Sequence, residues 1–582
     1  CPVCRDRPSV FNRNHLYNQS SVELTNLAFS IPRHWSVFPR RSSNASRTEG
    51  TIIMHMSGDI HLSGVHSAPS DSEDRYYLGF DAGTQSVKVA VYDSEMNPIV
   101  EVSNRTTLNY PGPRHVEMDP DEYVRLTVEG MAECSSRMEA LGLDPHSIRS
   151  IMGDGIICGI VPIGADGAPI GPYINYLDSR TQDDADLINS WNLSIWGQET
   201  GNADASCMFP ALFARWFLAD MSDSSRSEVK FVHNAPYILM KLAGTEALDA
   251  FIDQGTMSGW GLGYDVRRKR WSDEQLSILG LDRRMMPRIV KPWDIIGHLT
   301  SEMSEKTGLR PGTPICGGAG DTMQSMLGCG LIGSGRAADV SGTCSMFCVS
   351  TDGIVPELSV HGKGLIFNSG TLDDTYFYWG FIRTGGLSLR WFRDNICGDS
   401  VSYDDLTATA AEVPPGSNGV QVLPYLTGGY GDASNASGAF LNLGLDSDRA
   451  VLWRAVLEAI GFEYIGVTDQ YRSAGVSLDS ITIAEGGSEN DLWNQIKADM
   501  IGCTAEVMKT SGGAVLTDCI TAAYAIGDCS DLRSALSSAV CSDRMFVPNA
   551  DRTRAYRDIH LQRRAMMDDM GPVFSRLGSM RR

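Results

Sequence analysis

Residues 313–328 read TPICGGAGDTMQSMLG, and this stretch decides how the rest of the chain is interpreted. Its first four residues predict an apolar strand, the glycines predict a turn, and the small residues from Asp321 onward predict a helix. Glycine lets a backbone approach a ligand closely, and the free N–H groups at a helix start favour anionic groups. The stretch therefore predicts a place where phosphate would bind.

One carboxylate, Asp321, lies at the mouth of this glycine turn. An acid beside a phosphate site is costly unless it acts in the chemistry. Taking a proton from a hydroxyl that attacks a phosphoryl group is such a role. The alternative is that Asp321 only caps the helix.

Length and composition restrict the class of protein. A chain of 582 residues is too long for one core, so two or three large domains are expected. The net charge of −22 argues against nucleic acid or an anionic membrane as a partner. No apolar run approaches the length of a membrane span. The 14 cysteines are scattered through apolar runs, which is typical of reduced thiols in a cytoplasmic protein.

Residues 1–75 differ from the rest of the chain. They are rich in Arg, Ser and Asn without hydrophobic periodicity, so we expect a disordered leader, with an organelle transit peptide as the alternative. Met54 or Met56 could be the natural start. We expect a substrate-binding domain at 76–314, a nucleotide-binding domain at 315–530 and a C-terminal helical segment at 531–582.

The folded sequence begins with a predicted β-hairpin, in which strands at 77–80 and 88–92 flank a polar turn. The turn residues Gly83, Thr84, Gln85 and Ser86 can offer backbone N–H and hydroxyl donors to phosphate, and Lys88 adds positive charge. Asp81, at the strand end, could hold Mg²⁺ through water. An ordinary hairpin turn is the alternative interpretation.

A second group of polar residues follows a short predicted strand. Asp178 and Arg180 lie at a junction between this strand and a helix from Thr181, where they could contact a polyol. The residues by themselves favour the alternative, a local ion pair at the surface.

The second half of the chain repeats the pattern of the first hairpin, because a strand, a polar turn and a second strand are predicted around Gly342 and Thr343. Two such loops facing each other would hold a polyphosphate from both sides. A strand at 480–484, the turn Gly486-Gly487 and a helix from Ser488, with Ser488 and Asp491 at capping-box spacing, suit a nucleoside lying on the turn. The small-residue helix expected at 514–526 is best explained by packing.

In this order, these stretches resemble the FGGY carbohydrate kinases, which include xylulose, glycerol, erythritol and autoinducer-2 kinases. The matching segments are FDAGTQSVK at 80–88, YLDSR at 176–180, GGAGD at 317–321, SGTCS at 341–345 and EGGSENDLW at 485–493. The resemblance covers about residues 76–530.

The resemblance implies an α/β fold of two actin-like (ribonuclease H-like) domains with a cleft between them. It implies that Asp321 is the general base and that Asp81, Cys158, Asp178 and Arg180 lie near the substrate. It also implies ATP and Mg²⁺ as cofactors. The implied ATP-binding residues are Gly83, Thr84, Gln85, Ser86, Lys88, Gly342, Thr343, Gly486, Gly487 and Asn490.

The chain departs from this family near the substrate. Xylulose kinases usually carry G-Q-M-H-G where this chain has Gly155-Ile156-Ile157-Cys158-Gly159. A thiol replaces an imidazole donor, which argues against xylulose itself. Asp154 could supply the missing polar contact.

We therefore predict ATP-dependent phosphorylation of a hydroxyl of a small sugar or polyol, such as a pentulose or a tetritol. A non-catalytic, ATP-binding sugar sensor of the same fold is the first alternative. An actin-like or Hsp70-like ATPase is the second. A homodimer is one expectation for the assembly.

Overall fold

The computed structural model describes residues 75–342, 345–362, 364–382, 384–398, 400–426, 428, 436–508 and 513–580. All of these belong to one of two units of the chain, Asp71–Arg582. The expected leader, apart from Arg75, lies outside the described residues, and so does Thr343.

A seven-stranded mixed sheet forms the first half of the unit, in the order β13-β14-β5-β1-β2-β3, with β15 paired to β5. Its strands are β1 (Tyr76–Ala82), β2 (Ser86–Asp93), β3 (Pro98–Arg105), β5 (Ile148–Gly155), β13 (Ile295–His298), β14 (Pro314–Cys316) and β15 (Ala319–Gly320). The predicted hairpin is confirmed, because β1 and β2 pair antiparallel from Tyr76↔Asp93 to Ala82↔Val87. Strands β14 and β15 join this sheet, so the sheet draws on both sides of the boundary that we placed after residue 314.

A second seven-stranded mixed sheet has the order β18-β19-β17-β16-β22-β23-β24. Its strands are β16 (Arg336–Ser341), β17 (Ser345–Thr351), β18 (Leu365–Ser369), β19 (Tyr376–Ile382), β22 (Ser480–Ala484), β23 (Thr504–Met508) and β24 (Ser542–Phe546). In each sheet the first strand pairs antiparallel with the next strand and parallel with a later one, β5 or β22. The repeat of strand, polar turn and strand that the sequence predicts in both halves is therefore present in the topology.

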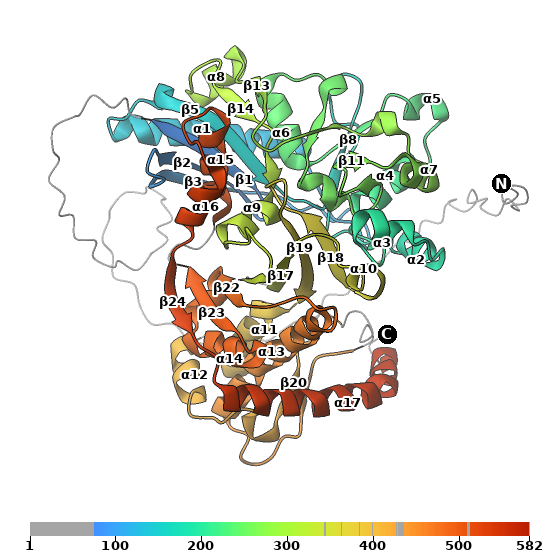
Figure 1. Cartoon of the computed structure of the whole chain (residues 1–582), viewed down its shortest axis with the longest axis vertical. Coiled ribbons are helices and arrows are strands. Elements are labelled where there is room, and N and C mark those ends of the chain that lie inside the picture. Colours follow the sequence, from blue (N-terminus) through green and yellow to red (C-terminus); the bar gives the residue numbers. More distant parts are fainter. Residues whose placement is uncertain are drawn as a thin grey trace, which may run out of the picture. The chain divides into compact units, whose positions relative to one another are not determined.

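Helices cover both sheets (Figure 1). They are α1 (Pro120–Ala140), α2 (Gln182–Ser190), α3 (Ile195–Thr200), α4 (Pro210–Leu218), α5 (Asp223–Arg226), α6 (Asn234–Ala243), α7 (Asp273–Leu279), α8 (Ser301–Thr307), α9 (Asp321–Gly328), α10 (Leu358–His361), α11 (Gly385–Phe392), α12 (Tyr403–Ala410), α13 (Arg449–Ser473), α14 (Asp491–Ile501), α15 (Gly513–Ala525), α16 (Leu532–Ala539) and α17 (Ala550–Met580). None of these described helices combines the length and apolarity needed to cross a membrane.

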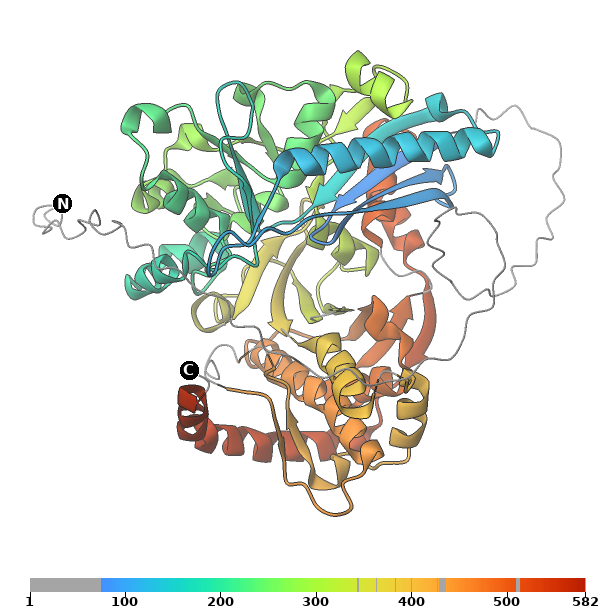
Figure 2. The same ribbon diagram turned by 180° about the vertical axis from the view of Figure 1, so that it is seen from behind.

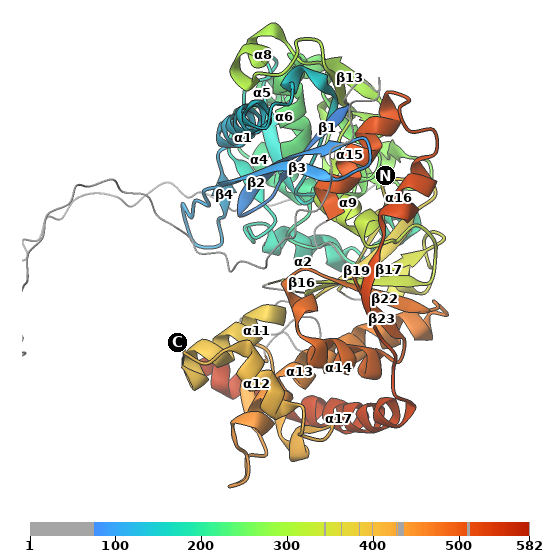
Figure 3. The same ribbon diagram turned by 90° about the vertical axis from the view of Figure 1, so that its left-hand side faces the viewer.

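Two helices from distant parts of the sequence cover opposite faces of the first sheet. A Cβ on Gly130 of α1 would meet Val89 of β2, and Phe80 is the register partner of Val89. A Cβ on Gly79 would instead meet Val515 of α15. Figure 2 shows α1 along one face, and Figure 3 shows α15 beside β1. Helix α15 thus brings the second half of the chain onto the first sheet.

Short strands complete the fold. They are β4 (Glu117–Met118), β6 (Gly159–Ile163), β7 (Tyr173–Asn175), β8 (Lys230–Val232), β9 (Phe251–Asp253), β10 (Tyr264–Asp265), β11 (Arg270–Trp271), β12 (Arg288–Val290), β20 (Gln421–Leu423) and β21 (Ala439–Leu441). The segment expected to be helical, from residue 531 onward, contains α16 and α17, and it also contains β24. This strand was missed because its sequence, SDRMF, is mostly polar, which suits the exposed edge of a sheet.

Candidate functional site

Three neighbouring strand ends place carboxylates along one edge of the first sheet. In the parallel pair of β1 and β5, Asp81 lies opposite Asp154. On the other side of β5, Ala319 of β15 also lies opposite Asp154, and Asp321 follows β15 directly. Carboxyl ends of parallel strands meet at the same edge of a sheet, so Asp81 and Asp321 are brought to one place although 240 positions separate them in the chain.

Asp321 is the first residue of α9, while Gly320 occupies the N-cap position. Its Oδ1 accepts hydrogen bonds from the Thr322 backbone N–H, at 2.6 Å, and from the Thr322 hydroxyl, at 3.2 Å. Burial and the charge of Asp81 raise the pKa of Asp321 to about 7, against the effect of these donors. A carboxylate with this pKa can take a proton near neutral pH, which a simple helix cap does not require.

Three hydrogen bonds to backbone carbonyls hold the predicted phosphate turn at 83–86 in place. Asn234 Nδ2 donates to the Ala82 carbonyl, at 2.8 Å. The Tyr123 hydroxyl donates to the Gly83 carbonyl, at 3.1 Å, and the Thr106 hydroxyl donates to the Thr84 carbonyl, at 2.6 Å. Gly83 lies close to the Asp81 carboxylate, since a Cβ on it would stand 3.6 Å from Oδ1. The backbone N–H groups of Thr84 and Gln85 take no part in these contacts, and neither has a backbone acceptor in the part of the chain that the structure describes.

The side chains of this turn differ in exposure. Gln85 is exposed, while Thr84, Ser86 and Lys88 are half-buried. Lys88 lies opposite Asp81 in the β1–β2 register, and its amine is 3.6 Å from Glu101 on β3. The charge of Lys88 lowers the pKa of Asp81, but burial outweighs it and raises that pKa overall. The ATP-binding roles of this turn remain predictions.

Sequence reasoning missed Asp518, which α15 carries to the same acidic cluster. Asp518 and Asp154 are both fully buried, and burial together with neighbouring carboxylates raises the pKa of each well above its usual value. Gln324 of α9 donates to Asp518 Oδ1, at 2.6 Å. The only signal in the sequence was a single acid inside the apolar helix GAVLTDCITAAYA.

The segment that departs from the xylulose kinase pattern lies beside Asp321. A Cβ on Gly320 would stand 2.2 Å from Cγ2 of Ile157, so Ile157 packs directly against the residue before the acid. The buried thiol of Cys158 lies 3.8 Å from the Gly259 carbonyl, and burial raises its pKa, so the thiol is neutral. The prediction that Cys158 contacts substrate stays a prediction, but this segment is placed next to the candidate base.

Asp178 and Arg180 form a buried ion pair with each other. Arg180 Nε and Nη2 donate to the two Asp178 oxygens at 2.9 and 2.7 Å, and Nη2 also donates to Glu117, at 2.6 Å. The guanidinium lies 4.5 Å from the ring centre of Trp216. The local ion pair that the residues favoured is therefore present, although it is buried and not at the surface. The substrate-binding role of these two residues remains a prediction.

The two glycine turns of the second half touch each other. Strands β16 and β22 are parallel neighbours with Val340 opposite Ala484, so Ser341-Gly342 and Glu485-Gly486 leave the sheet side by side. A Cβ on Gly487 would stand only 2.3 Å from Cβ of Ser341, which explains the need for glycine at this position. The Gly342 carbonyl accepts from Gly386 at the start of α11, at 3.0 Å.

Helix α14 begins later than predicted. Its cap is Asn490, whose Oδ1 accepts from the Trp493 backbone N–H, at 3.0 Å, while Gly486–Glu489 form a 3₁₀ turn. The predicted capping by Ser488 is wrong, because Asn490 is itself a favoured cap residue and lies nearer the helix. Asn490 Nδ2 donates to Thr407, at 2.9 Å. Its contact with a nucleoside stays a prediction.

Metal binding was predicted at Asp81. In the described part of the chain, no three His, Cys, Asp or Glu side chains are placed to hold a metal ion together. Asp81 Oδ1 is buried and has no hydrogen-bond partner among the described residues. An oxygen of this kind fits Mg²⁺, which commonly takes one or two protein carboxylates and completes its coordination with water and phosphate.

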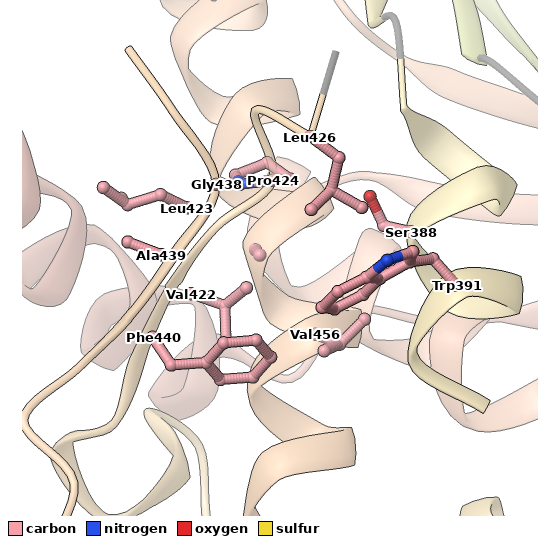
Figure 4. Close-up of a pocket in the computed structure, with 11 residues that line it drawn as sticks. Ser388, Trp391, Val422, Leu423, Pro424, Leu426, Gly438, Ala439, Phe440 and Val456 are labelled. Carbon is pink, nitrogen blue, oxygen red and sulfur yellow. The ribbon is translucent and has the colours of Figure 1, made fainter. Parts of the chain in front are cut away.

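A separate apolar pocket of about 170 Å³ lies between α11, α13 and the β20–β21 hairpin (Figure 4). Trp391, Val422, Phe440 and Val456 line it, and the Ser388 side chain stands at its side. None of the predicted site residues belongs to its lining. It is therefore distinct from the acidic edge and the glycine turns.

Comparison with known proteins gives relatives that match most of the chain. It is 24% identical over 497 residues to a xylulose kinase of Bacillus subtilis, covering 83% of this chain and 95% of the relative. It is 26% identical over 522 residues to an autoinducer-2 kinase of Escherichia coli K12, covering 86% of this chain and 95% of the relative.

Solved structures share the fold. A ligand-bound xylulose kinase from Lactobacillus acidophilus has a TM-score of 0.78 at 21% identity, covering 86% of this chain and 100% of that one. A glycerol kinase of Plasmodium falciparum with ADP has a TM-score of 0.76 at 19% identity, covering 85% and 98% of the two chains. The predicted fold of two domains, each with a mixed sheet, is confirmed.

The family itself follows from two models that match in sequence order. The N-terminal domain of the FGGY family of carbohydrate kinases matches residues 76–328, and the C-terminal domain matches residues 337–526. The chain therefore belongs to the FGGY family of carbohydrate kinases.

Proposed function

We propose that this kinase transfers the γ-phosphoryl group of ATP to a hydroxyl of a small sugar or polyol, with Asp321 as the general base. The observation that carries the proposal is the position of Asp321, directly after β15 and beside Asp81, with a pKa raised to about 7. A base that titrates near the working pH is well matched to proton transfer.

The nucleotide in this proposal lies between two sets of turns. Gly83 to Ser86 offer backbone and hydroxyl donors from the first half, and Gly342, Gly486 and Gly487 from the second. The charge of Glu485, just before the second glycine turn, raises the pKa of Asp81, which supports the closeness of these regions. The ADP in the Plasmodium glycerol kinase is that protein's ligand, and with the shared fold it supports ATP as the phosphoryl donor here.

Mg²⁺, when bound with ATP, neutralises charge that develops on the phosphates. Asp81 would hold it, since Oδ1 is buried without a donor. The residues of the chain do the rest. Asp321 orients the substrate hydroxyl and accepts its proton as the oxygen attacks the γ-phosphorus in line, while the bond from the γ-phosphorus to the β–γ bridging oxygen breaks and ADP leaves. The glycine turns fix the phosphates, and exclusion of water prevents hydrolysis of ATP.

For the substrate, the proposal favours a tetritol, or a pentulose other than xylulose. Ile157 lies beside Gly320, and Ile157 and Cys158 take the positions where xylulose kinases usually carry Met and His. The Cys158 thiol lies 3.8 Å from the Gly259 carbonyl. An apolar side chain and a weak donor offer the substrate fewer hydrogen bonds than an imidazole. This end of the site therefore offers the substrate fewer hydrogen bonds than a xylulose kinase does, which supports a substrate other than xylulose.

A coupled ADP-release assay over a panel of pentuloses, tetritols and glycerol tests the proposal. We expect ADP release that depends on one or a few of these compounds and stays at background without them. ADP release without any sugar would indicate an ATPase of the actin or Hsp70 kind. ATP binding with no sugar-dependent release from the whole panel would overturn phosphoryl transfer in favour of a sugar sensor.

A further inference from the structure

Lys497 is a fully buried cation at the base of the two glycine turns of the second half, at 341–342 and 486–487. Its Nζ donates to Asp339 Oδ2, at 2.6 Å, and to the Ser341 hydroxyl, at 3.0 Å. Both charged side chains have 0% exposure. The Trp493 ring lies beneath the ammonium, with 3.7 Å from Nζ to the ring centre. Tyr464 satisfies the other Asp339 oxygen, at 2.6 Å.

This buried pair connects helix α14 to the end of strand β16. Asp339 and Ser341 are on β16, and Ser341 is the last residue before Gly342. Lys497 is on α14, seven residues after the Asn490 cap. The ammonium therefore fixes the point where the chain leaves the sheet to form the first of the two turns.

The same helix also fixes the other turn. Asn494 Nδ2 donates to the Ser488 carbonyl, at 2.7 Å, in the 3₁₀ turn that contains Gly486 and Gly487. Ser341 is thus held from two sides, by the Lys497 ammonium and by Gly487, which packs against its Cβ. One rigid helix sets the distance between the two turns.

We propose that Lys497 is a positioning residue for nucleotide binding, which holds the 341–342 turn against the 486–487 turn so that both contact one ATP. The inference rests on the proposed function, because it assumes that these turns bind the nucleotide. A single rigid helix that sets both turns keeps their backbone N–H groups at a fixed separation before ATP arrives, and such preorganisation strengthens binding.

A matched control separates positioning from stability. Arg454 of α13 forms a similar buried pair with Glu458, at 2.8 Å, and its Nη2 donates to Tyr556, at 2.7 Å. This pair holds Gly416 and Ser417, away from the glycine turns. Lys497→Met and Arg454→Met each remove a cation from a buried carboxylate, so both lower stability. Only Lys497→Met removes the hydrogen bond to Ser341.

The experiment is a calorimetric titration of the full chain with ATP in the presence of Mg²⁺. We expect Lys497→Met to raise the Kd for ATP on the order of 10- to 100-fold, because small misplacements of binding groups have large effects. Arg454→Met should bind like the wild type. Ser341→Ala keeps the ion pair and loses one hydrogen bond, so it should weaken ATP binding by about 2- to 10-fold and decides the question if Lys497→Met does not fold.

Kinetics supply a second readout on the sugar found by the panel. The KM for ATP should rise in Lys497→Met and Ser341→Ala while the KM for the sugar stays within about twofold, the change expected when no contact to that ligand is lost. ATP affinity unchanged in folded Lys497→Met or Ser341→Ala, or reduced equally in Arg454→Met, would overturn the inference and leave the proposed function standing. A wild-type protein that binds no ATP would overturn both.

Discussion

Carboxyl groups gather beside both sheets, but they are balanced differently. At the first sheet, Asp81 of β1, Asp154 of β5 and Asp518 of α15 approach one another, and no Lys, Arg or His of the described chain forms an ion pair with them. In the second sheet, Asp339 is matched by Lys497, at 2.6 Å, and by the Tyr464 hydroxyl. The carboxyl groups of the first region have raised pKa values because burial is not offset by a paired cation, whereas the second region is a complete ion pair.

The difference supports the proposal that the first region is a site for chemistry and that the second is a support for the backbone. Charge taken out of water without a partner is costly, so a protein retains it where a ligand, a proton or a cation completes it. In the proposed function, an incoming metal–nucleotide complex and a substrate proton supply the missing positive charge at the first cluster. The second pair is complete in itself and holds the backbone.

The largest effect is expected in the first cluster. Asp321→Asn removes the candidate base and keeps its size, so turnover should fall by about 10²–10⁴, as is typical for loss of a general base. Steady-state ADP release measures this effect, and ATP titration of the same variant serves as the control. Near-normal turnover with normal ATP binding would show that Asp321 is not the base.

The next effect tests the second pair. Asp339→Asn leaves the Lys497 charge buried without its carboxylate, and breaking a buried pair in this way costs about 3–5 kcal/mol of unfolding free energy. Urea unfolding at pH 7 measures it. The double variant Asp339→Asn with Lys497→Met removes both charges and should recover most of the loss. An equal loss of unfolding free energy in the single and double variants would mean that the unpaired charge of Lys497 does not cause the loss.

The matched change in the first cluster should have a smaller effect. Asp518→Asn replaces a carboxyl group whose pKa is already raised by burial and acidic neighbours, and the amide oxygen can still accept from Gln324. We therefore expect the unfolding free energy at pH 7 to stay within about 1 kcal/mol of the wild type, or to rise. A loss as large as that of Asp339→Asn would contradict the contrast between the two regions.

The smallest effect concerns pH. A base must be ionised, and burial raises the pKa of Asp321 to about 7, so kcat/KM should fall about tenfold per pH unit below 7 and rise about twofold from pH 7 to 8. Stability moves the other way, because the contribution of a carboxyl with a raised pKa is lost as pH rises through that value. A flat rate profile between pH 6 and 8 would rule out this assignment.

Much of the first sheet could be predicted from local pattern. The short apolar runs on either side of the polar turn at 81–86 predicted the hairpin, and Asp119-Pro120 predicted the start of α1. These signals depend on the preferences of a few adjacent residues, which a single sequence displays. The glycine turn before Asp321 was equally visible for that reason.

Other parts of the site depend on contacts between distant segments. The α15 helix was expected to pack only, yet it places Asp518 beside Asp154, 364 positions earlier. Lys497 looks like a surface residue in a helix and becomes buried only because Trp493, Tyr464 and β16 enclose it. Asp178 and Arg180 were likewise expected at the surface, because the sequence does not show which distant segments bury them.

The sequence by itself determined the candidate reacting groups, which are an acid after a glycine turn and two glycine-rich loops, and it showed that the chain is long enough for two domains. The tertiary structure decided their electrostatics, because a carboxylate acquires a raised pKa only when other segments bury it and bring further charges near. Propensity and spacing are properties of neighbouring residues, whereas desolvation and pairing belong to the folded chain.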